Sequence, residues 1–353
     1  MAASMLRTIH IQRGIHMTVP SNIAVDTQAP VSHLQRQDWV QGVRTDLEKV
    51  TDKIRSVSFL DNPLLDNAID KIISNGGKRM RPAITMLVGR IVNAAFDPTL
   101  SVAASVELLH TATLVHDDLI DSAKERRGAP TLHTALPLGV TVLTGDFLFA
   151  QAAALAAEAN HVEVVKVFSR TLVSICRGEI LQAQTKWQIP TMDTYIERIY
   201  GKTAALFEAA AVSGALLGKH ISEDEVQAFG TFGRELGLAF QMIDDALDFV
   251  STTEKLGKPA GNDLRQGIIT LPVLYYLQNE GITDDVAFLK SLDNPDRLEG
   301  VIKGVRETGA ARQAYELARD YVAKAEAGLS GVEWSPALDL LLDLAHYAVA
   351  RDF

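Results

Sequence analysis

An Asp-Asp-x-x-Asp pattern that occurs twice, each time within a long apolar segment, constrains this chain more than any other feature. The six residues concerned are Asp117, Asp118, Asp121, Asp244, Asp245 and Asp248. Residues four apart on a helix lie on one face, so the first and last aspartate of each copy project side by side. Burying a carboxylate is costly unless it has a partner. The pattern therefore predicts two helices whose acidic clusters face one cavity and bind cations there.

The kind of cation follows from the ligand type. Carboxylate oxygens are hard ligands, and Mg²⁺ keeps several waters while sharing its coordination shell with substrate phosphates. A single acidic cluster on a helix is usually a solvated surface, but two copies in apolar surroundings favour a functional site. We expect the six aspartates to hold a diphosphate through bridging Mg²⁺, with Mn²⁺ as the alternative metal.

Basic residues next to glycines and to the acidic clusters predict a second anion site. Arginine matches phosphate oxygens with two parallel hydrogen bonds, whereas lysine supplies a compact charge. The candidates are Lys78, Arg81, Arg126, Arg127, Lys202 and Lys258. A lone basic residue is usually a surface charge, but this association in an acidic chain favours binding. The sequence thus predicts one anion site built with metal and one built from side chains alone.

Composition narrows the remaining classes of function. The 353 residues include 47% hydrophobic ones and carry a formal net charge of −10, so a nucleic-acid partner is not expected. Cys176 is the single cysteine, which rules out an internal disulfide and permits a reducing compartment. Asp146 and Glu208 interrupt the longest apolar runs. We therefore expect a cytoplasmic protein without a transmembrane segment.

The chain reads as a disordered extension followed by one helical domain. Residues 1–35 are polar, contain prolines and lack periodicity, and the first 17 fit a transit peptide, a leader or an early start codon. Residues 36–353 predict a single all-α domain of long helices, because no period-2 strand is evident. The helices are expected at 40–56, 64–74, 83–95, 100–120, 138–159, 162–187, 191–217, 223–250, 270–278, 286–292, 294–307, 310–328 and 336–350, with a loop at 256–267.

Five ordered motifs resemble those of the trans-isoprenyl diphosphate synthases, or polyprenyl synthetases, of the bacterial medium- or long-chain type. They are Gly-Gly-Lys78-x-x-Arg81-Pro, Asp117-Asp118-x-x-Asp121 followed by Arg126-Arg127-Gly, Gly-Lys202-Thr203, Gln241-x-x-Asp244-Asp245-x-x-Asp248 and Gly257-Lys258. The resemblance implies a bundle of long antiparallel helices around a central cavity, usually in a homodimer. It also implies Mg²⁺-dependent head-to-tail condensation of isopentenyl diphosphate with an allylic diphosphate.

The resemblance implies roles for single residues as well. Three Mg²⁺ ions per site would be held by the aspartates of both clusters, with Asp248 outermost. The ligands of the allylic diphosphate would be Arg126, Lys202 and Lys258. Those of isopentenyl diphosphate would be Lys78, Arg81, His110 and Arg127. Thr203 and Gln241 would line the reaction centre.

One position departs from the family pattern. Ile268 stands near the place where much of the family has a lysine. The allylic diphosphate would then have one cation fewer, unless Arg265 replaces it.

Product length is predicted from the residues that precede the first cluster. On a helix, Thr113 and Ala112 lie one turn deeper than Asp117, and both are small. Bulky aromatics near these positions act as a floor in the short-chain members that the sequence resembles. Small residues favour a geranylgeranyl or longer polyprenyl product, with a farnesyl diphosphate synthase as the alternative.

Three other functions compete with this interpretation. A class I terpene cyclase has the same fold but needs no second diphosphate site, so Lys78 and Arg81 argue against it. A di-iron bundle requires two Glu-x-x-His pairs, which occur here at 107–110 and 158–161 but leave the basic motifs unexplained. A non-catalytic regulatory subunit would generally lose one acidic cluster, whereas both are present.

Overall fold

The computed structural model describes residues 38–59, 62–74, 77–126, 128–250 and 260–350. The expected extension at 1–35, together with Arg127 and Lys258, lies outside these residues. The described part is almost wholly helical, which confirms the all-α prediction. Its elements are α1 (Asp38–Val57), α2 (Pro63–Ser74), α3 (Met80–Ile91), α4 (Phe96–Ile120), β1 (Glu125–Arg126), β2 (Ala129–Pro130), α5 (Leu132–Ala135), α6 (Leu138–Glu158), α7 (Val162–Gln184), α8 (Met192–Ile199), the π-helical turn η1 (Tyr200–Ala204), α9 (Ala205–Leu216), α10 (Glu223–Val250), α12 (Asn262–Arg265), α13 (Leu271–Asn279), α14 (Asp285–Ser291), α15 (Pro295–Glu307), α16 (Ala310–Gly328) and α17 (Pro336–Val349).

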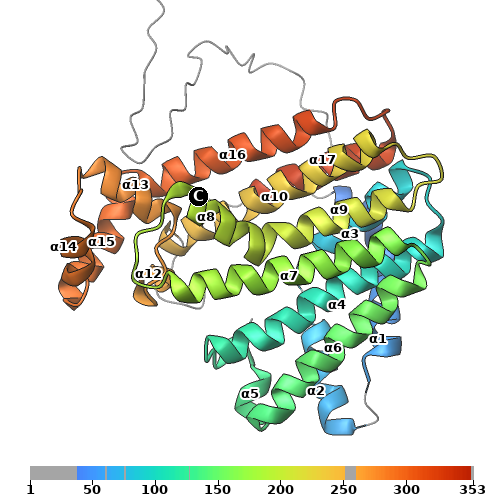
Figure 1. Ribbon diagram of the computed structural model, residues 1–353, viewed down its shortest axis with the longest axis horizontal. Coiled ribbons are helices and arrows are strands. Elements are labelled where there is room, and N and C mark those ends of the chain that lie inside the picture. The colour runs from blue at the N-terminus through green and yellow to red at the C-terminus, as the bar shows by residue number, and fades with distance from the viewer. Residues whose placement is uncertain (1–37, 60–61, 75–76, 127, 251–259, 351–353) are drawn as a thin grey trace, which may run out of the picture. The chain divides into compact units, whose positions relative to one another are not determined.

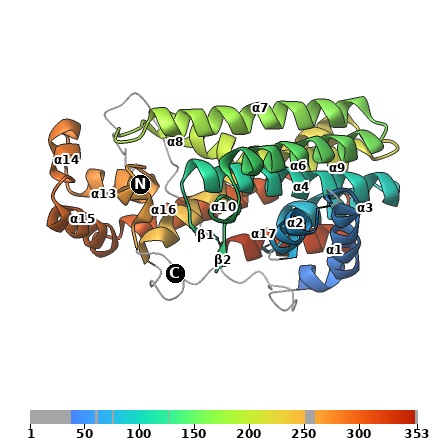
Figure 2. The same ribbon diagram turned by 90° about the horizontal axis from the view of Figure 1, so that it is seen from below.

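Helix α9 lies at the centre of the bundle. It contacts α3, α4, α7 and α10, while α10 packs in turn against α16 and α4 against α6 (Figure 1). Most residues of α9 are alanine or other apolar types and are buried, because a helix that is apolar all round must be covered on every side. Small side chains allow the neighbours to approach closely. The long helices α4, α7 and α10 each contact α9, and in Figure 2 α7 runs along the top of the bundle, above α6.

Three local features differ from the sequence-based expectation. The sequence predicts a helix that begins at residue 100, but α4 begins at Phe96 and includes Pro98. Proline is tolerated in the first turn, where its missing N–H has no intrahelical partner. The single helix expected at 191–217 is instead α8 and α9 joined by the π-helical turn η1. A two-residue antiparallel pair, β1 and β2, carries Arg126 back towards α4.

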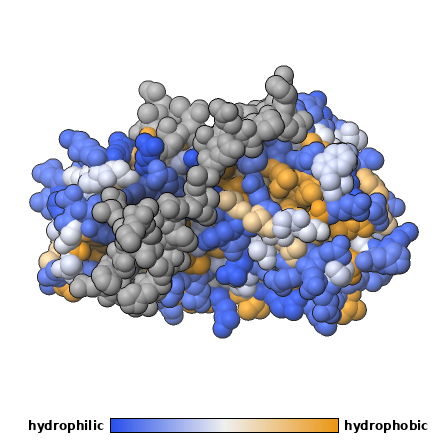
Figure 3. All heavy atoms as spheres, turned by 90° about the horizontal axis from the view of Figure 1, so that it is seen from above, coloured by the Kyte–Doolittle hydropathy of each residue, from blue (hydrophilic) through white to orange (hydrophobic). Residues whose placement is uncertain are grey.

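Apolar side chains fill the interior, and the described part of the surface is mixed. On the face shown in Figure 3, hydrophilic side chains cover most of the described area and apolar ones gather in a smaller area at the right. One described helix, α6, is long and apolar enough to cross a membrane by length and composition alone. That helix packs against α4 and α7. The expectation of a cytoplasmic protein without a membrane span stays a prediction.

Candidate active site

A cavity of about 530 Å³ opens between α3, α4, η1, α9 and α10. Eleven residues singled out from the sequence line it: Lys78, Arg81, His110, Thr113, Asp117, Asp121, Arg126, Lys202, Thr203, Gln241 and Asp244. The structure thus brings together residues that are up to 166 positions apart, from Lys78 to Asp244. Both kinds of predicted anion ligand, acidic and basic, share one hollow.

Asp117, Asp121 and Asp244, here called the acidic wall, line the cavity from α4 and α10. The pKa of Asp117 is raised to about 7, first by burial and then by the charges of Glu179 and Asp121, against the lowering effect of Lys202 and Arg126. Carboxylates held this close in a desolvated place favour a cation between them. The acidic wall therefore has the donor type and the electrostatics of a metal site.

The second aspartate of each copy lies outside the lining. Asp118 is buried and accepts a 2.7 Å hydrogen bond from Nε of Arg126. Asp245 is buried too, and its two carboxylate oxygens accept from the Tyr195 hydroxyl and the Gln241 amide, each at 2.8 Å. A residue one position further along a helix is rotated by about 100°. Each of these aspartates thus orients a neighbour that lines the cavity or supports it.

Asp248 also lies outside the lining. Its carboxylate accepts the backbone N–H of Asp263 at 3.1 Å, and its carbonyl accepts the N–H of Gly261 at 2.8 Å. The end of α10 is thereby joined to the segment that follows residues 251–259.

The fit of the acidic wall to a metal depends on what else would complete the coordination. Within the described ranges, no three Asp, Glu, His or Cys side chains form a group that could hold a metal ion by themselves. Mg²⁺ commonly takes one or two carboxylates and fills its shell with water and substrate phosphate. Aspartates on opposite helices of one cavity suit that mode of binding, with a diphosphate between them.

The π-helical turn η1 presents Lys202 and Thr203 to the cavity. Its backbone lies against α7, where a Cβ built on Gly178 would be 2.7 Å from the backbone nitrogen of Lys202. A Cβ on Gly201 would be equally close to the Ser174 carbonyl oxygen, at 2.7 Å. Glycine is required at both positions because no side chain fits between the two backbones. π-Turns of this kind are frequent at functional sites.

Thr203 belongs to a chain of hydrogen bonds that crosses from η1 to α10. Its hydroxyl donates to Oε1 of Gln241 at 2.6 Å, and the Gln241 amide donates to Asp245. Burial, followed by the charge of Asp263, raises the pKa of Asp245. Burial and the charge of Asp245 raise the pKa of Tyr195 well above its usual value. The hydroxyl of Tyr195 therefore stays protonated and donates, and the direction of the whole chain follows.

Glu179 of α7 was not singled out from the sequence. Its Oε1 lies 3.0 Å from Nζ of Lys202. Burial lowers the pKa of Lys202, but the charges of Glu179 and Asp117 outweigh it, so the net shift is upward. Glu179 sits in no recognisable motif, and its proximity to Lys202 depends on the packing of α7 against η1.

Lys78 and Arg81, here called the basic wall, reach the cavity from the start of α3. The Lys78 ammonium lies 4.5 Å from the ring centroid of Tyr347, and the Arg81 guanidinium lies 4.5 Å from that of Phe207. An aromatic face attracts a cation and restricts where it can lie. The basic wall is thus supported by rings from α17 and α9.

Other predicted residues occupy different environments. Thr113 lines the cavity, whereas Ala112 is fully buried outside its lining. Ile268 is buried as well. Arg265 pairs with Glu299 at 2.6 Å and donates to the Ala260 carbonyl, so neither residue adds a cation to the lining.

The Glu-x-x-His pairs at 107–110 and 158–161 do not converge. Glu107 and His110 line the cavity. Glu158 instead pairs with Lys53 at 2.7 Å and accepts a hydrogen bond from Ser101. A di-iron centre built from both pairs is therefore incompatible with this structure.

Comparisons with known proteins agree with this geometry. A family model described as "Polyprenyl synthetase" matches residues 62–306. Solanesyl diphosphate synthase 2, chloroplastic, of Arabidopsis thaliana is 37% identical over 330 residues, covering 92% of this chain and 77% of that protein. Heptaprenyl diphosphate synthase component 2 of Geobacillus stearothermophilus is 38% identical over 310 residues, covering 87% and 96%.

Solved structures show the same fold. A polyprenyl synthase from Caulobacter crescentus, complexed with calcium and isoprenyl diphosphate, superposes with a TM-score of 0.83 at 33% identity, covering 90% of this chain and 98% of that one. A decaprenyl diphosphate synthase from Rhodobacter capsulatus superposes with a TM-score of 0.82 at 32% identity, covering 89% and 98%. The chain described here is therefore a prenyltransferase and belongs to the polyprenyl synthetase family, the trans-isoprenyl diphosphate synthases of medium- or long-chain type.

Proposed function

We propose that this enzyme condenses isopentenyl diphosphate head-to-tail with an allylic diphosphate and releases a geranylgeranyl or longer polyprenyl diphosphate. The observation that carries the proposal is the placement of the acidic wall and the basic wall in one cavity. A condensing enzyme must hold two diphosphates at once, and the two walls offer two chemically different ways to bind one.

The acidic wall is assigned to the allylic diphosphate. Asp117, Asp121 and Asp244 would hold Mg²⁺, with Asp118, Asp245 and Asp248 supporting the site from behind. When bound, the metal supplies Lewis-acid stabilisation of the pyrophosphate that leaves as the allylic C–O bond breaks. Lys202 and Arg126 lie beside this wall and add positive charge towards the same leaving group. The Caulobacter crescentus relative is complexed with calcium and isoprenyl diphosphate, which supports binding of a divalent cation together with a diphosphate by an enzyme of this fold.

Thr203 and Gln241 are assigned to the developing carbocation. Because the Thr203 hydroxyl donates its proton to Gln241, its oxygen lone pairs remain for the cavity. The negative end of that dipole stabilises a nearby positive charge, and the fixed direction of the hydrogen-bond chain removes the cost of reorienting it. Apolar lining residues such as Leu206 and Phe240 keep water from the cation.

The basic wall, with His110, is assigned to isopentenyl diphosphate. Lys78 and Arg81 bind an anion by charge and by the planar guanidinium fork, without a metal. The isopentenyl double bond attacks C1 of the allylic cation, and the pyrophosphate released in the first step takes the proton that is then lost. Arg127 and Lys258, assigned to the two diphosphates by the family resemblance, keep that assignment as a proposal.

Product length is proposed from the floor of the cavity. Thr113 and Leu206 line it, and Leu206 also borders a small second gap between α4, α7 and α9 that is lined by Ser105, Leu109 and Phe168. A growing chain that displaces Leu206 would extend into this gap. The similar solved structures include a geranylgeranyl pyrophosphate synthetase and a decaprenyl diphosphate synthase, which favours a product longer than farnesyl. Thr113→Phe should shorten the main product, as sized by chromatography; an unchanged product length would reject this floor.

A homodimer is proposed from the surface of α7. Val162, Val165, Val173 and Ile180 are exposed and fall on one face of the helix by its 3.6-residue period, and exposed apolar stripes commonly mark interfaces. The neighbouring α6 exposes Leu143. Light scattering of the purified enzyme should give twice the mass of one chain. In Ile180→Asp the measured mass should fall to that of a single chain. A monomer in both cases would refute the homodimer and direct attention to a second subunit, because one relative is named as "component 2".

Incubation with radiolabelled isopentenyl diphosphate and Mg²⁺ tests the whole proposal. Labelled polyprenyl diphosphate should form when geranyl, farnesyl or geranylgeranyl diphosphate is added and should be absent without an allylic partner. A cyclic hydrocarbon made from the allylic diphosphate alone would establish a terpene cyclase instead. A fifteen-carbon end product would establish the short-chain alternative.

A further inference from the structure

Arg79 lies between the two residues of the basic wall in an unusual conformation. It is the residue that precedes α3, with φ 50° and ψ 38° in the left-handed region. A residue with a side chain rarely adopts this conformation, and it persists where surrounding contacts hold it. The contacts that hold Arg79 therefore show what the chain requires at this point.

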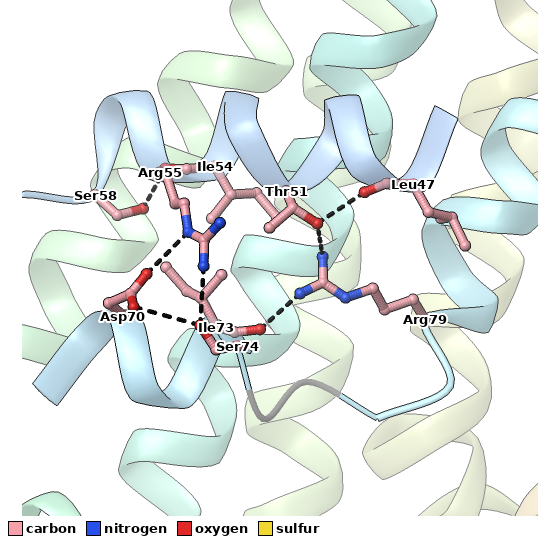
Figure 4. A network of polar contacts seen from close by, with 9 residues as sticks. All are labelled: Leu47, Thr51, Ile54, Arg55, Ser58, Asp70, Ile73, Ser74 and Arg79. Carbon is pink, nitrogen blue, oxygen red and sulfur yellow. Dashed lines mark hydrogen bonds and ion pairs between the residues drawn. The ribbon is translucent and has the colours of Figure 1, made fainter. Parts of the chain in front are cut away.

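The guanidinium of Arg79 joins two other helices (Figure 4). Nη2 donates to the carbonyl of Ile73 at 2.6 Å, and Nη1 donates to the hydroxyl of Thr51 at 2.5 Å. Because α2 ends at Ser74, the Ile73 carbonyl is in the last turn and has no partner within the helix. A cation is also favoured at a helix C-terminus. Arg79 thus closes the end of α2 and connects it to α1 at the same time.

Both acceptors are held in place independently of Arg79. The Thr51 hydroxyl donates its own proton to the Leu47 carbonyl at 2.7 Å, which leaves a lone pair directed at Arg79. Arg55 links α1 to α2 through a 2.9 Å ion pair with Asp70 and a 2.9 Å hydrogen bond to Ser74 (Figure 4). Arg79 consequently docks into a preformed pair of acceptors.

We propose that Arg79 is a positioning residue for the isopentenyl diphosphate side of the reaction, an inference that rests on the proposed function. Its guanidinium fork fixes the left-handed residue between Lys78, which precedes α3, and Arg81, which lies in the first turn of α3; both of these side chains line the cavity. Without the fork, residues 78–80 relax towards ordinary backbone angles, and the basic wall loses its geometry. Arg79 directs its hydrogen bonds to α1 and α2, whereas the acidic wall belongs to the C-terminal end of α4 and to α10, so the allylic side is expected to remain unchanged.

Two substitutions of Arg79 separate its side chain from its backbone. Arg79→Lys keeps the charge but loses the planar fork that reaches both acceptors. Arg79→Gly removes the side chain while accommodating the left-handed angles. The KM for isopentenyl diphosphate should rise about tenfold in Arg79→Lys and more in Arg79→Gly, because small displacements of binding groups have large effects. The KM for the allylic diphosphate should stay within about twofold of wild type.

Two further variants make the result decisive. Thr51→Val removes one acceptor at a position outside the cavity lining and should raise the isopentenyl diphosphate KM in the same direction. Arg90→Lys is the matched control: Arg90 also joins α3 to α1, through the Gly42 carbonyl and Asp46, but at the far end of α3. This control should leave both KM values unchanged. Unfolding temperature and far-ultraviolet circular dichroism confirm that each variant is folded.

Each other outcome overturns the inference. A raised KM in Arg79→Lys with none in Thr51→Val would mean that Arg79 contacts the diphosphate directly. Equal effects on both substrates, or an equal effect of Arg90→Lys, would reduce the role of Arg79 to general packing. Unchanged kinetics in a folded Arg79→Gly would exclude any role. If the wild-type enzyme does not catalyse condensation, the proposed function itself is refuted. That outcome is distinct from a failure of the inference about Arg79.

Discussion

The acidic wall and the basic wall face the same cavity but are positioned by different means. Asp117 lies in the last turn of α4, Asp121 is the residue that caps that helix, and Asp244 lies within α10, so helix geometry largely sets where they point. Lys78 precedes α3 and Arg81 lies in its first turn, and the proposed support for both is Arg79, which is tied to other helices. One wall is rigid through local structure, and the other is rigid through side-chain contacts between distant segments.

This difference has a consequence for the two binding steps. In the acidic wall, burial and the charges of Glu179 and Asp121 raise the pKa of Asp117 to about 7, so a cation bound there would stabilise the charged form of this carboxyl. The basic wall is already supported by aromatic rings and needs no third component. Under the proposed function, binding of the allylic diphosphate would therefore depend on metal and protons, whereas binding of isopentenyl diphosphate would depend on the geometry of one turn.

The largest kinetic difference between the two walls is expected when one charged residue of either wall is replaced by a neutral one. Asp117→Asn or Asp244→Asn should lower kcat about 10³-fold, since metal-assisted departure of pyrophosphate is lost. Arg81→Gln should mainly raise the KM for isopentenyl diphosphate, about tenfold or roughly 1.4 kcal/mol. Steady-state kinetics with each substrate varied in turn measures both. The distinction between the two walls is refuted if Arg81→Gln and Asp244→Asn both change mainly kcat or both change mainly the KM for isopentenyl diphosphate.

The next effect concerns the close contact that sets the π-helical turn. In Gly178→Ala the new methyl group would meet the backbone of Lys202, so η1 must move, at a cost of about 1–3 kcal/mol in stability. We expect kcat to fall about 100-fold because Lys202 and Thr203 are displaced together. Gly139→Ala is the control, since a Cβ there meets nothing within 4 Å. Full activity in Gly178→Ala would show that η1 tolerates a shift.

Glu179→Gln should have a smaller effect on the same side. The Lys202 ammonium loses its ion pair, so kcat should fall about tenfold while the isopentenyl diphosphate KM stays constant. Glu179→Asp should restore part of the activity if charge is what matters. Glu163→Gln, which removes an exposed ion pair to Lys166 on the same helix, should be silent. If Glu163→Gln lowers kcat by the same factor, the effect comes from a change in α7 as a whole and not from the ion pair with Lys202.

The smallest effect is a dependence of metal binding on pH. The folded pKa of Asp117, about 7, exceeds its ordinary value of 3.8. Between these values the folded chain holds a proton that the unfolded chain has released, so the contribution of Asp117 to the stability of the metal-free protein falls as pH rises. Mg²⁺ must displace that proton. The increase in unfolding temperature caused by Mg²⁺ should therefore grow from about pH 5.5 to about pH 8. A pH-independent increase would contradict the assignment of Asp117 as a ligand.

Much of the fold was predictable from the sequence because helix formation is local. The boundaries of α10 and α16 agree with the apolar periodicity and its flanking signals. The predicted start of α4 was wrong because proline, here Pro98, is tolerated in the first turn of a helix. The break at η1 could not be foreseen, since it arises from the contact between Gly178 and Gly201, which are distant in sequence.

The family, the helical class and the residue types of the two proposed anion sites could be inferred from the amino-acid sequence alone. Periodicity places Asp117 beside Asp121, because 3.6 residues per turn is a property of the backbone alone. Tertiary structure decided which aspartates line the cavity, and it turned Asp118 towards Arg126 and Asp245 towards Tyr195. It also brought Glu179 to Lys202 and Arg79 to Thr51. These pairings depend on how separate helices pack, and no local pattern encodes them.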